Sequence, residues 1–151
     1  MKRTNSSKAV AELLTQIGRL SHSHGFTGGL NPAQWMALRY FGQANPSVCT
    51  VMRFADFYGS SRGTASQSIS ALVRKGYLVR RPSPEKKSSH ILEVTDAGRV
   101  LLSQDPIKYL IRGIEGLPAS KVADFAESLE ILIRHLFKES DGDDMAIEPS
   151  E

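Results

Sequence analysis

Polar side chains recur at helical spacing in residues 62–75, and they could form hydrogen bonds with the edges of DNA bases. They are Arg62, Ser66, Gln67, Ser70 and Arg74. The other face of this stretch carries Ala65, Ile69 and Leu72, at spacings of four and three, which is typical of a helix with one buried face. Gln and Arg side chains can read adenine and guanine edges in the major groove. The stretch therefore predicts an exposed helix that can enter a DNA groove.

Residues 50–98 contain the elements that must position this helix. Thr50 is expected to cap a short preceding helix, Gly59-Ser60-Ser61 to form a tight turn, and Ser61 to cap the reading helix, 61–75. Gly76 is placed to end that helix. Two strands, 77–81 and 90–94, follow with a polar loop between them. Gly63 early in the reading helix has two interpretations that stay open: it only weakens the helix, or it lets the backbone approach DNA closely.

Positive charge is concentrated in the same region, although the net charge is only +3. Residues 53–99 hold nine Lys or Arg and four acids, whereas residues 100–151 hold five and eleven. A basic patch beside an insertable helix favours a polyanionic partner, here double-stranded DNA; the alternative is an ordinary solvated face. We expect base-edge contacts from Arg62, Ser66, Gln67 and Ser70. Phosphate contacts are expected from Thr64, Arg74, Arg80, Arg81, Lys86 and Lys87.

The remaining chain predicts a mainly α (α+β) protein whose terminal helices flank the central domain. We expect a helix over 7–20, a loop containing His22 and His24, and a helix opened by Asn31 and Pro32 that reaches Gln43. Further helices are expected over 97–116, with a bend at Pro106, and from about 119 to 138. The predicted divisions are 1–30 for an N-terminal dimerisation helix and loop, 31–98 for the DNA-binding domain (wing 79–94), 99–138 for C-terminal dimerisation helices, and 139–151 for an acidic disordered tail.

The predicted terminal helices carry more apolar side chains than a domain of this size can cover. Pairing with a second copy of the chain would cover them and would set two reading helices about one DNA turn apart. The alternative is that these helices pack back on their own domain.

Several classes of protein are disfavoured. No apolar run approaches the roughly 18 residues of a membrane span, and no apolar segment follows the basic N-terminus as in a signal peptide. One cysteine permits no internal disulfide, which fits the cytoplasm. His22 and His24 lack the further ligands that a metal site needs, and no nucleophile motif or phosphate cradle indicates an enzyme or a cofactor.

Residues 54–98 are similar to the MarR family of bacterial transcriptional regulators, and the resemblance extends over nearly the whole chain. Its motifs are Phe54-Ala55, Leu72-Val73-Arg74-Lys75-Gly76-Tyr77-Leu78, Arg80-Arg81 and Val94-Thr95-Asp96-Ala97-Gly98, in this order and spacing. The resemblance implies a dimeric winged helix-turn-helix protein whose N- and C-terminal helices form the dimer body. It implies binding to a pseudo-palindromic DNA site, usually with repression of nearby genes.

The chain departs from the family's pattern in the wing. Where the family commonly has Asp-x-Arg, with the arginine in the minor groove, this chain has Lys86 and Ser88. Lysine is a point charge without the guanidinium's fork, so phosphate contact is expected to persist while minor-groove reading is in question. Gln67 also stands where many relatives have Arg, which should change the preferred base.

The resemblance also implies that DNA is released when a small, often aromatic, acid binds between the dimer body and the reading domain. Trp35, Arg39 and Tyr40, with His22 or His24, are the candidate ligand-binding residues; the alternative is that Trp35 and Tyr40 are ordinary core. Cys49 suggests a redox-sensing variant or, alternatively, a half-buried structural thiol. The alternative function is a winged-helix protein-interaction module without sequence-specific DNA binding.

Overall fold

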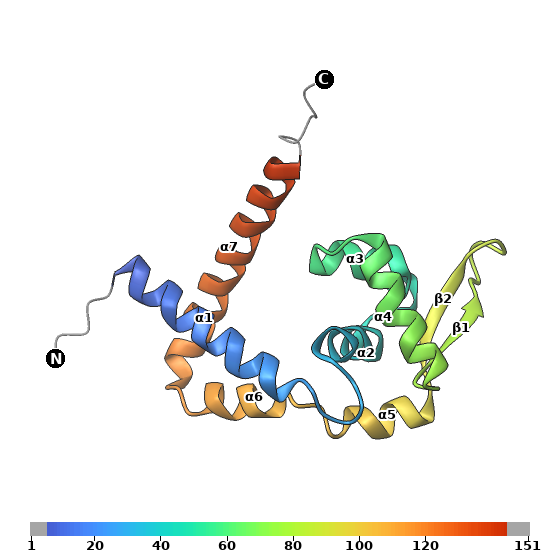
Figure 1. Ribbon diagram of the computed structural model, residues 1–151, viewed down its shortest axis with the longest axis horizontal. Helices are drawn as coiled ribbons and strands as arrows, with labels where there is room; N and C mark the ends of the chain where they lie inside the picture. Colours follow the sequence, from blue (N-terminus) through green and yellow to red (C-terminus); the bar gives the residue numbers. More distant parts are fainter. Residues whose placement is uncertain (1–5, 145–151) are drawn as a thin grey trace. The chain divides into compact units, whose positions relative to one another are not determined.

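The computed structural model describes residues 6–144, and side chains to residue 140. The chain divides into two compact units, residues 1–108 and 109–151. The helices and strands labelled in Figure 1 are α1 (Ser7–His24), α2 (Pro32–Gln43), α3 (Val51–Tyr58), α4 (Arg62–Arg74), β1 (Leu78–Pro82), β2 (His90–Val94), α5 (Asp96–Leu102), α6 (Lys108–Glu115) and α7 (Ala119–Asp144). A 3-10 turn, η1 (Pro46–Val48), lies between α2 and α3. The mainly α fold with a two-stranded wing is the one predicted from the sequence.

Helix α2 forms the centre of the first unit, and it begins as predicted. The Asn31 side chain accepts a hydrogen bond from the Gln34 amide, and the Gln34 side chain accepts one from the Asn31 amide, which makes a reciprocal capping box before Pro32. Trp35 and Leu38 are almost fully buried on this helix. The remaining core comes mainly from α3, α4, the hairpin and α5, so α2 is the support on which the reading elements rest.

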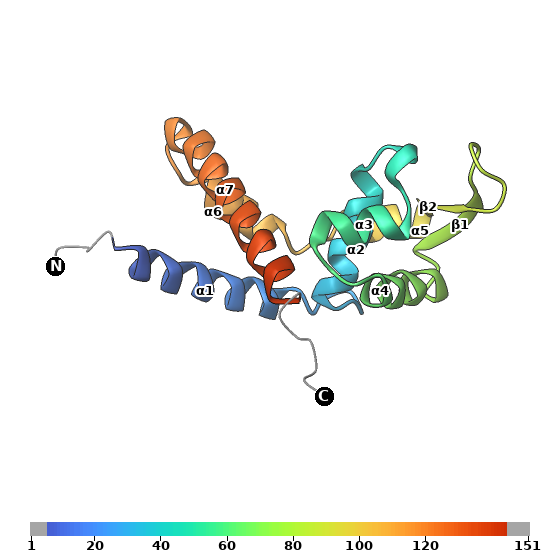
Figure 2. The ribbon, with the colours of Figure 1, turned by 90° about the horizontal axis from the view of Figure 1, so that it is seen from above.

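The turn between α3 and α4 is fixed by caps that the sequence predicts. Thr50 accepts from the Arg53 amide at the start of α3, and Gly59 ends that helix in the left-handed conformation, at φ 60°. Ser61 then accepts from the Thr64 amide at 3.1 Å and opens α4. Figure 2 shows α3 and α4 of this helix-turn-helix next to each other.

Helix α4 buries the predicted stripe and ends at the predicted glycine. Ala65, Ile69 and Leu72 are at most 1% exposed. Gly76 follows the C-cap Lys75 with a φ of 79°, a conformation that L side chains rarely adopt. The chain can therefore reverse at once into β1.

The wing is an antiparallel hairpin in which Leu78 pairs with Val94 and Pro82 pairs with His90. Leu78, Leu92 and Val94 are buried on one face. The Leu92 amide donates to the Cys49 carbonyl at 2.8 Å, so the segment before α3 is bonded to the inner strand of the wing. Figures 1 and 2 both show the hairpin extending away from α2, α3 and α4.

Three predictions of local structure are wrong. His22 and His24 lie in the last turn of α1, not in a loop. The single bent helix over 97–116 is instead two helices, α5 and α6, because Pro106 has no amide hydrogen and the Asp105 side chain accepts from the Ile107 amide between them. Helix α7 continues to Asp144, beyond the expected start of disorder at 139; residues 145–151 of the predicted tail lie outside the described residues.

Helices α1, α6 and α7 leave many large apolar side chains exposed in the single chain. They include Leu13 and Ile17 on α1, Ile111 on α6, and Ile133 and Leu136 on α7. Among residues 6–144, no helix combines the length and apolar character needed to cross a membrane.

The glycine of the predicted Val-Thr-x-x-Gly motif is required by close packing. A Cβ at Gly98 would collide with the Tyr77 carbonyl oxygen and approach Val94 Cγ1 to 2.7 Å. We therefore predict that Gly98→Ala lowers the free energy of unfolding by about 1–3 kcal/mol, the usual cost of overpacking. Urea unfolding followed by circular dichroism, at one protein concentration, measures it.

Gly63→Ala is the matched control for this prediction. A Cβ at Gly63 meets nothing within 4 Å, so alanine should stabilise α4 by up to about 1 kcal/mol. Equal effects of the two substitutions would contradict the packing role of Gly98.

Candidate nucleic-acid interface

Helix α4 presents its predicted polar face to solvent. Arg62, Thr64, Gln67 and Arg74 are exposed, whereas Ser66 and Ser70 are half-buried. This follows from the burial of the opposite stripe, since a helix docked through Ala65, Ile69 and Leu72 must turn the other positions outward. The surface offers amide, hydroxyl and guanidinium donors.

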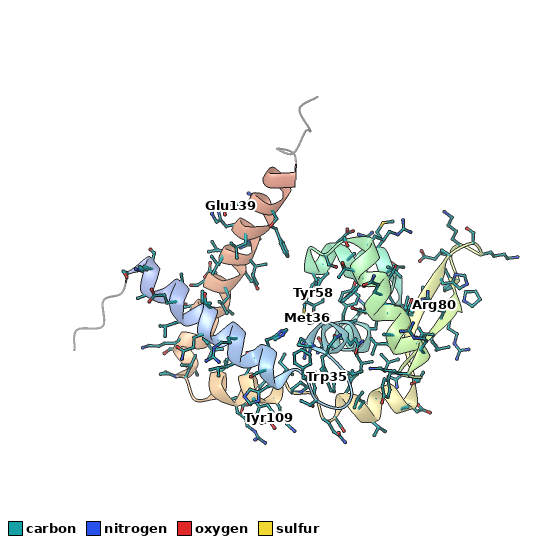
Figure 3. All side chains as sticks on the ribbon, viewed as in Figure 1. Trp35, Met36, Tyr58, Arg80, Tyr109 and Glu139 are labelled. Atoms are coloured by element: carbon teal, nitrogen blue, oxygen red, sulfur yellow. The ribbon has the colours of Figure 1, made fainter. Side chains whose placement is uncertain are left out.

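Arg80 of the wing joins this polar face. Its guanidinium donates to Ser70 Oγ at 3.1 Å, so the first strand of the wing and the reading helix share one exposed hydrogen bond. Figure 3 shows Arg80 beside α4. Sequence reasoning placed Arg80 at phosphates and Ser70 at base edges; the structure brings the two together. No sequence signal links two positions ten residues apart on different elements.

Arg81 lies on the other side of the hairpin, because successive strand residues point to opposite faces. Its Nε donates to the Glu93 carboxylate at 3.1 Å, and both side chains are more than half exposed. Arg80 and Arg81, both expected to contact phosphates, therefore lie on opposite faces of the hairpin. Arg80 belongs with α4, and Arg81 has a carboxylate partner in solvent.

Lys86 and Lys87 lie exposed in the loop between the strands. Backbone bonds shape this loop: the Ser83 amide donates to the Ser89 carbonyl, and the Ser89 amide donates to the Lys86 carbonyl. The loop therefore presents its two cations on a hydrogen-bonded turn at the end of the wing.

Lys75 belongs to the basic cluster in the sequence, but its side chain bonds to another segment of the same chain. Its ammonium donates to the Gly29 carbonyl at 2.5 Å and approaches the Gln34 amide oxygen at 3.4 Å. The end of the reading helix is thereby tied to the segment that leads into α2.

The candidate ligand-binding residues do not all line one cleft. Trp35 is 1% exposed, and its indole donates to the Thr27 carbonyl at 3.0 Å, so it is a satisfied core residue. His22 is exposed and its ring packs edge-on against Phe26. Trp35 and Met36 are labelled on α2 in Figure 3.

Arg39 and Tyr40, in contrast, line one cleft of about 640 Å³ within the first unit. The cleft's other walls are mainly the segment from Gln43 to Val48 and one side of α3, and its lining residues are Arg39, Tyr40, Gln43, Ala44, Asn45, Val48, Arg53, Asp56, Phe57 and Tyr58. Sequence reasoning missed the contribution of α3, because the apolar pattern assigns Phe57 to the core, whereas its side chain is 61% exposed.

Arg39 and Tyr40, the two predicted ligand-binding residues that line this cleft, already have hydrogen-bond partners in the protein. The Arg39 guanidinium holds the Asp105 carboxylate through two hydrogen bonds, of 2.8 and 2.7 Å. The Tyr40 hydroxyl donates to the Val48 carbonyl at 2.9 Å. Burial raises the pKa of Tyr40, and likewise that of Tyr58 on α3. The cleft is therefore lined by neutral phenols and two arginines, with Asp56 as its carboxylate.

Cys49 has the environment of a structural thiol. It is 5% exposed, and its sulfur donates to the Asn45 carbonyl at 3.3 Å. Burial, with a smaller contribution from the Glu93 carboxylate, raises the pKa of the Cys49 thiol. A raised pKa disfavours the thiolate that reacts with oxidants. Among the described residues, no three His, Cys, Asp or Glu side chains gather as for a metal ion.

Comparison with known proteins places this geometry in a family. A family model described as "MarR family" matches residues 28–87, the segment from the loop before α2 to the tip of the wing. This segment belongs to the MarR family. The resemblance predicted from the sequence is thus confirmed, and the chain has the fold of a MarR-family transcription regulator. No curated protein matches the chain significantly.

Solved structures with the same fold extend the likeness beyond that segment. A MarR transcriptional regulator from Methanosarcina mazei Go1 is 16% identical, with a TM-score of 0.69, over 87% of this chain and 99% of that one. CouR from Rhodococcus jostii RHA1, bound to p-coumaroyl-CoA, is 18% identical, with a TM-score of 0.72, over 85% and 95%. A MarR/EmrR family regulator from Acinetobacter sp. ADP1 is 20% identical, with a TM-score of 0.63, over 89% and 96%.

The environment of Cys49 predicts low reactivity. We expect the native thiol to react with iodoacetamide at least about tenfold more slowly than the same thiol in urea at about pH 8, because burial blocks access and disfavours the thiolate. Mass spectrometry over a time course measures both rates. Equal rates would instead indicate an accessible, redox-competent cysteine.

Proposed function

We propose that the protein is a homodimeric, DNA-binding transcriptional repressor that recognises a pseudo-palindromic duplex in the cytoplasm and is relieved by a small ligand. The observation that carries this proposal is the outward polar face of α4 beside Arg80, with Lys86 and Lys87 at the end of the wing. Gln67, Ser66, Ser70 and Arg62 would approach base edges. Thr64, Arg74, Arg80, Arg81, Lys86 and Lys87 would lie at phosphates.

The contacts of Arg80 and Arg81 refine these roles. Arg80 lies next to Ser70, so it would contact the phosphates that border the groove occupied by α4. Arg81 would first have to leave Glu93, although that exposed pair is worth little and yields readily to a phosphate.

Exposed apolar faces support the dimer. On α7, Phe125, Leu132 and Leu136 are each more than a third exposed, and their spacings of seven and four put them on one helix face. On α1, Val10, Leu13, Ile17 and Leu20 recur at three and four. Such faces are expected to be covered in a stable protein, and a two-fold partner supplies the same surfaces in return.

The cleft between α2 and α3 supports the ligand response. Tyr40, Phe57 and Tyr58 offer aromatic faces, and Arg39 and Arg53 offer cations, which suits a small aromatic acid. CouR, of the same fold, was crystallised with p-coumaroyl-CoA. A ligand need only bind unequally to the two spacings of the reading helices to release DNA.

A protein-interaction module is the second candidate, since a basic face can also meet an acidic protein. Selection of bound sites from random duplexes, at about 0.1 M salt, separates the two. Repeated enrichment of one two-fold-related sequence supports the regulator, and the absence of any shared sequence favours the interaction module.

The wing lysines should act through charge alone. We predict that Lys86→Ala with Lys87→Ala weakens binding to all duplexes alike and flattens the dependence of log K on log salt by about 0.9 for each phosphate contact removed. Fluorescence anisotropy with the selected site and a scrambled duplex, over a salt series, measures both effects.

Gln67→Ala is the control from the base-reading face. It should leave the salt slope unchanged and alter the preference at one base pair by about 1–3 kcal/mol. A change of sequence preference from the lysine pair, with an unchanged slope, would reverse these roles.

The apolar face of α7 should hold the dimer. We predict that Leu136→Glu shifts the protein towards monomer and weakens binding to a full site by more than binding to a half-site, because a carboxylate would be desolvated in the interface. Sedimentation equilibrium measures the first effect. Lys138→Gln, which makes the same change in net charge on α7, should leave the dimer intact.

A further inference from the structure

We propose that Arg80 is a positioning residue for base recognition: it holds the Ser70 hydroxyl as a hydrogen-bond donor towards DNA, so that Ser70 recognises an acceptor on a base edge and not an amino group. This inference rests on the proposed DNA-binding function and deepens it. It states which kind of group one side chain of α4 reads, and it gives Arg80 a second role beside its expected contact with phosphate.

Ser70 has a different hydrogen bond from other hydroxyls within the helices. A serine or threonine inside a helix often donates to the carbonyl four residues earlier. Thr15, Ser128 and Ser140 do so in α1 and α7, at 2.9, 2.7 and 3.0 Å. Ser70 instead accepts from Arg80 Nη2 at 3.1 Å, and no described residue accepts a hydrogen bond from Ser70.

Arg80 reaches Ser70 because of its place in the hairpin. It pairs with Leu92 across the antiparallel strands, and both Leu92 and Leu78, two residues before Arg80, are buried. Side chains two residues apart on a strand point to the same face, so Arg80 emerges from the face of the hairpin that enters the core. Its guanidinium therefore lies at the edge of the core, beside α4 (Figure 3).

The bond to Arg80 determines what the two side chains still offer to DNA. A serine hydroxyl has one hydrogen and two lone pairs, and an arginine has N–H groups but no acceptor. Arg80 uses one N–H and occupies one lone pair of Ser70. The hydroxyl hydrogen of Ser70 therefore remains for an acceptor outside the protein. The other N–H groups of Arg80 remain for phosphate oxygens.

Insertion of α4 into the major groove makes this arrangement selective. Water leaves the surface, and a hydroxyl hydrogen without an acceptor then carries a desolvation cost. Guanine O6, thymine O4 and the purine N7 are acceptors in the major groove, whereas adenine N6 and cytosine N4 are donors. An amino group could use only the remaining lone pair of Ser70, and the adjacent guanidinium repels its positive hydrogens. Ser70 should therefore lie against an acceptor.

Ser70→Ala identifies the base pair that Ser70 reads. Sites selected from random duplexes by the wild type and by Ser70→Ala should differ at one base pair of each half-site, where the variant loses its preference. At that pair, duplexes are built from base analogues that lack one group: the keto oxygen, the purine N7 or the exocyclic amino group. Fluorescence anisotropy should show the wild type binding about fivefold more weakly without one of the acceptors, and less than about twofold more weakly without the amino group.

Arg80→Met separates the positioning role from charge. It should flatten the salt slope by about 0.9 through the lost phosphate contact. It should also reduce the penalty for the missing acceptor from about fivefold to less than about twofold, because Ser70 can then turn to the carbonyl four residues earlier.

Arg74→Met is the matched control. Arg74 is an exposed arginine on α4, and the same charge is removed, but the donor to Ser70 is Arg80. The salt slope should flatten by a similar amount, while the penalty for the missing acceptor stays at about fivefold. Circular dichroism verifies the fold of each variant, and the duplex analogues test the donor role of Ser70 with wild-type protein alone.

Three results would overturn this role of Arg80. They are a larger loss from removing the amino group than from removing either acceptor, equal effects of Arg80→Met and Arg74→Met on the acceptor penalty, or selected sites that Ser70→Ala leaves unchanged. Each of them leaves the proposed function intact, because a shared site has still been selected. The absence of any shared site would instead count against the proposed function, and this inference would fall with it.

Discussion

The Thr95 hydroxyl joins three elements whose positions decide whether α4 can act as a reading helix. It donates to the Gly76 carbonyl at 2.6 Å and accepts from the Gly98 amide at 3.1 Å, while the Thr95 amide donates to the Tyr77 carbonyl. The end of α4, the base of the wing and the start of α5 therefore meet around one side chain. Gly98 has to be a glycine for this approach, and Gly76 has to reverse the chain directly after α4. The polar face of α4 and Arg80 can share a surface because this junction fixes the angle between helix and strand.

Local features were predictable where one residue's chemistry determines the backbone. Asn31, Thr50 and Ser61 begin helices because their side chains accept from amides that have no partner in the first turn. The stripe on α4 follows from helical period alone. The break between α5 and α6 was predicted only as a bend at Pro106, because apolar spacing continues across it. The pattern does not show that the Asp105 side chain replaces the helical acceptor of the Ile107 amide.

Long-range pairs were beyond the sequence for a different reason. Arg39 and Asp105 are 66 residues apart, and Arg80 meets Ser70 only because the hairpin folds back on α4. Arginine and carboxylate are common in any chain, so composition cannot select the partners. For Trp35 the sequence left two interpretations open, a ligand-binding residue or a core residue. Its burial and the hydrogen bond of its indole show that it belongs to the core.

The energetic contrast between the two inter-element arginine pairs indicates where regulation can act. Arg81–Glu93 is exposed, so a phosphate or water replaces Glu93 at little cost and no conformational change has to follow. Arg39–Asp105 is mostly shielded, and breaking it without replacement leaves a poorly solvated charge on each side. The equilibrium can shift only by the difference in ligand affinity between the two states. A change that breaks the shielded Arg39–Asp105 pair therefore alters stability far more than one that breaks the exposed Arg81–Glu93 pair.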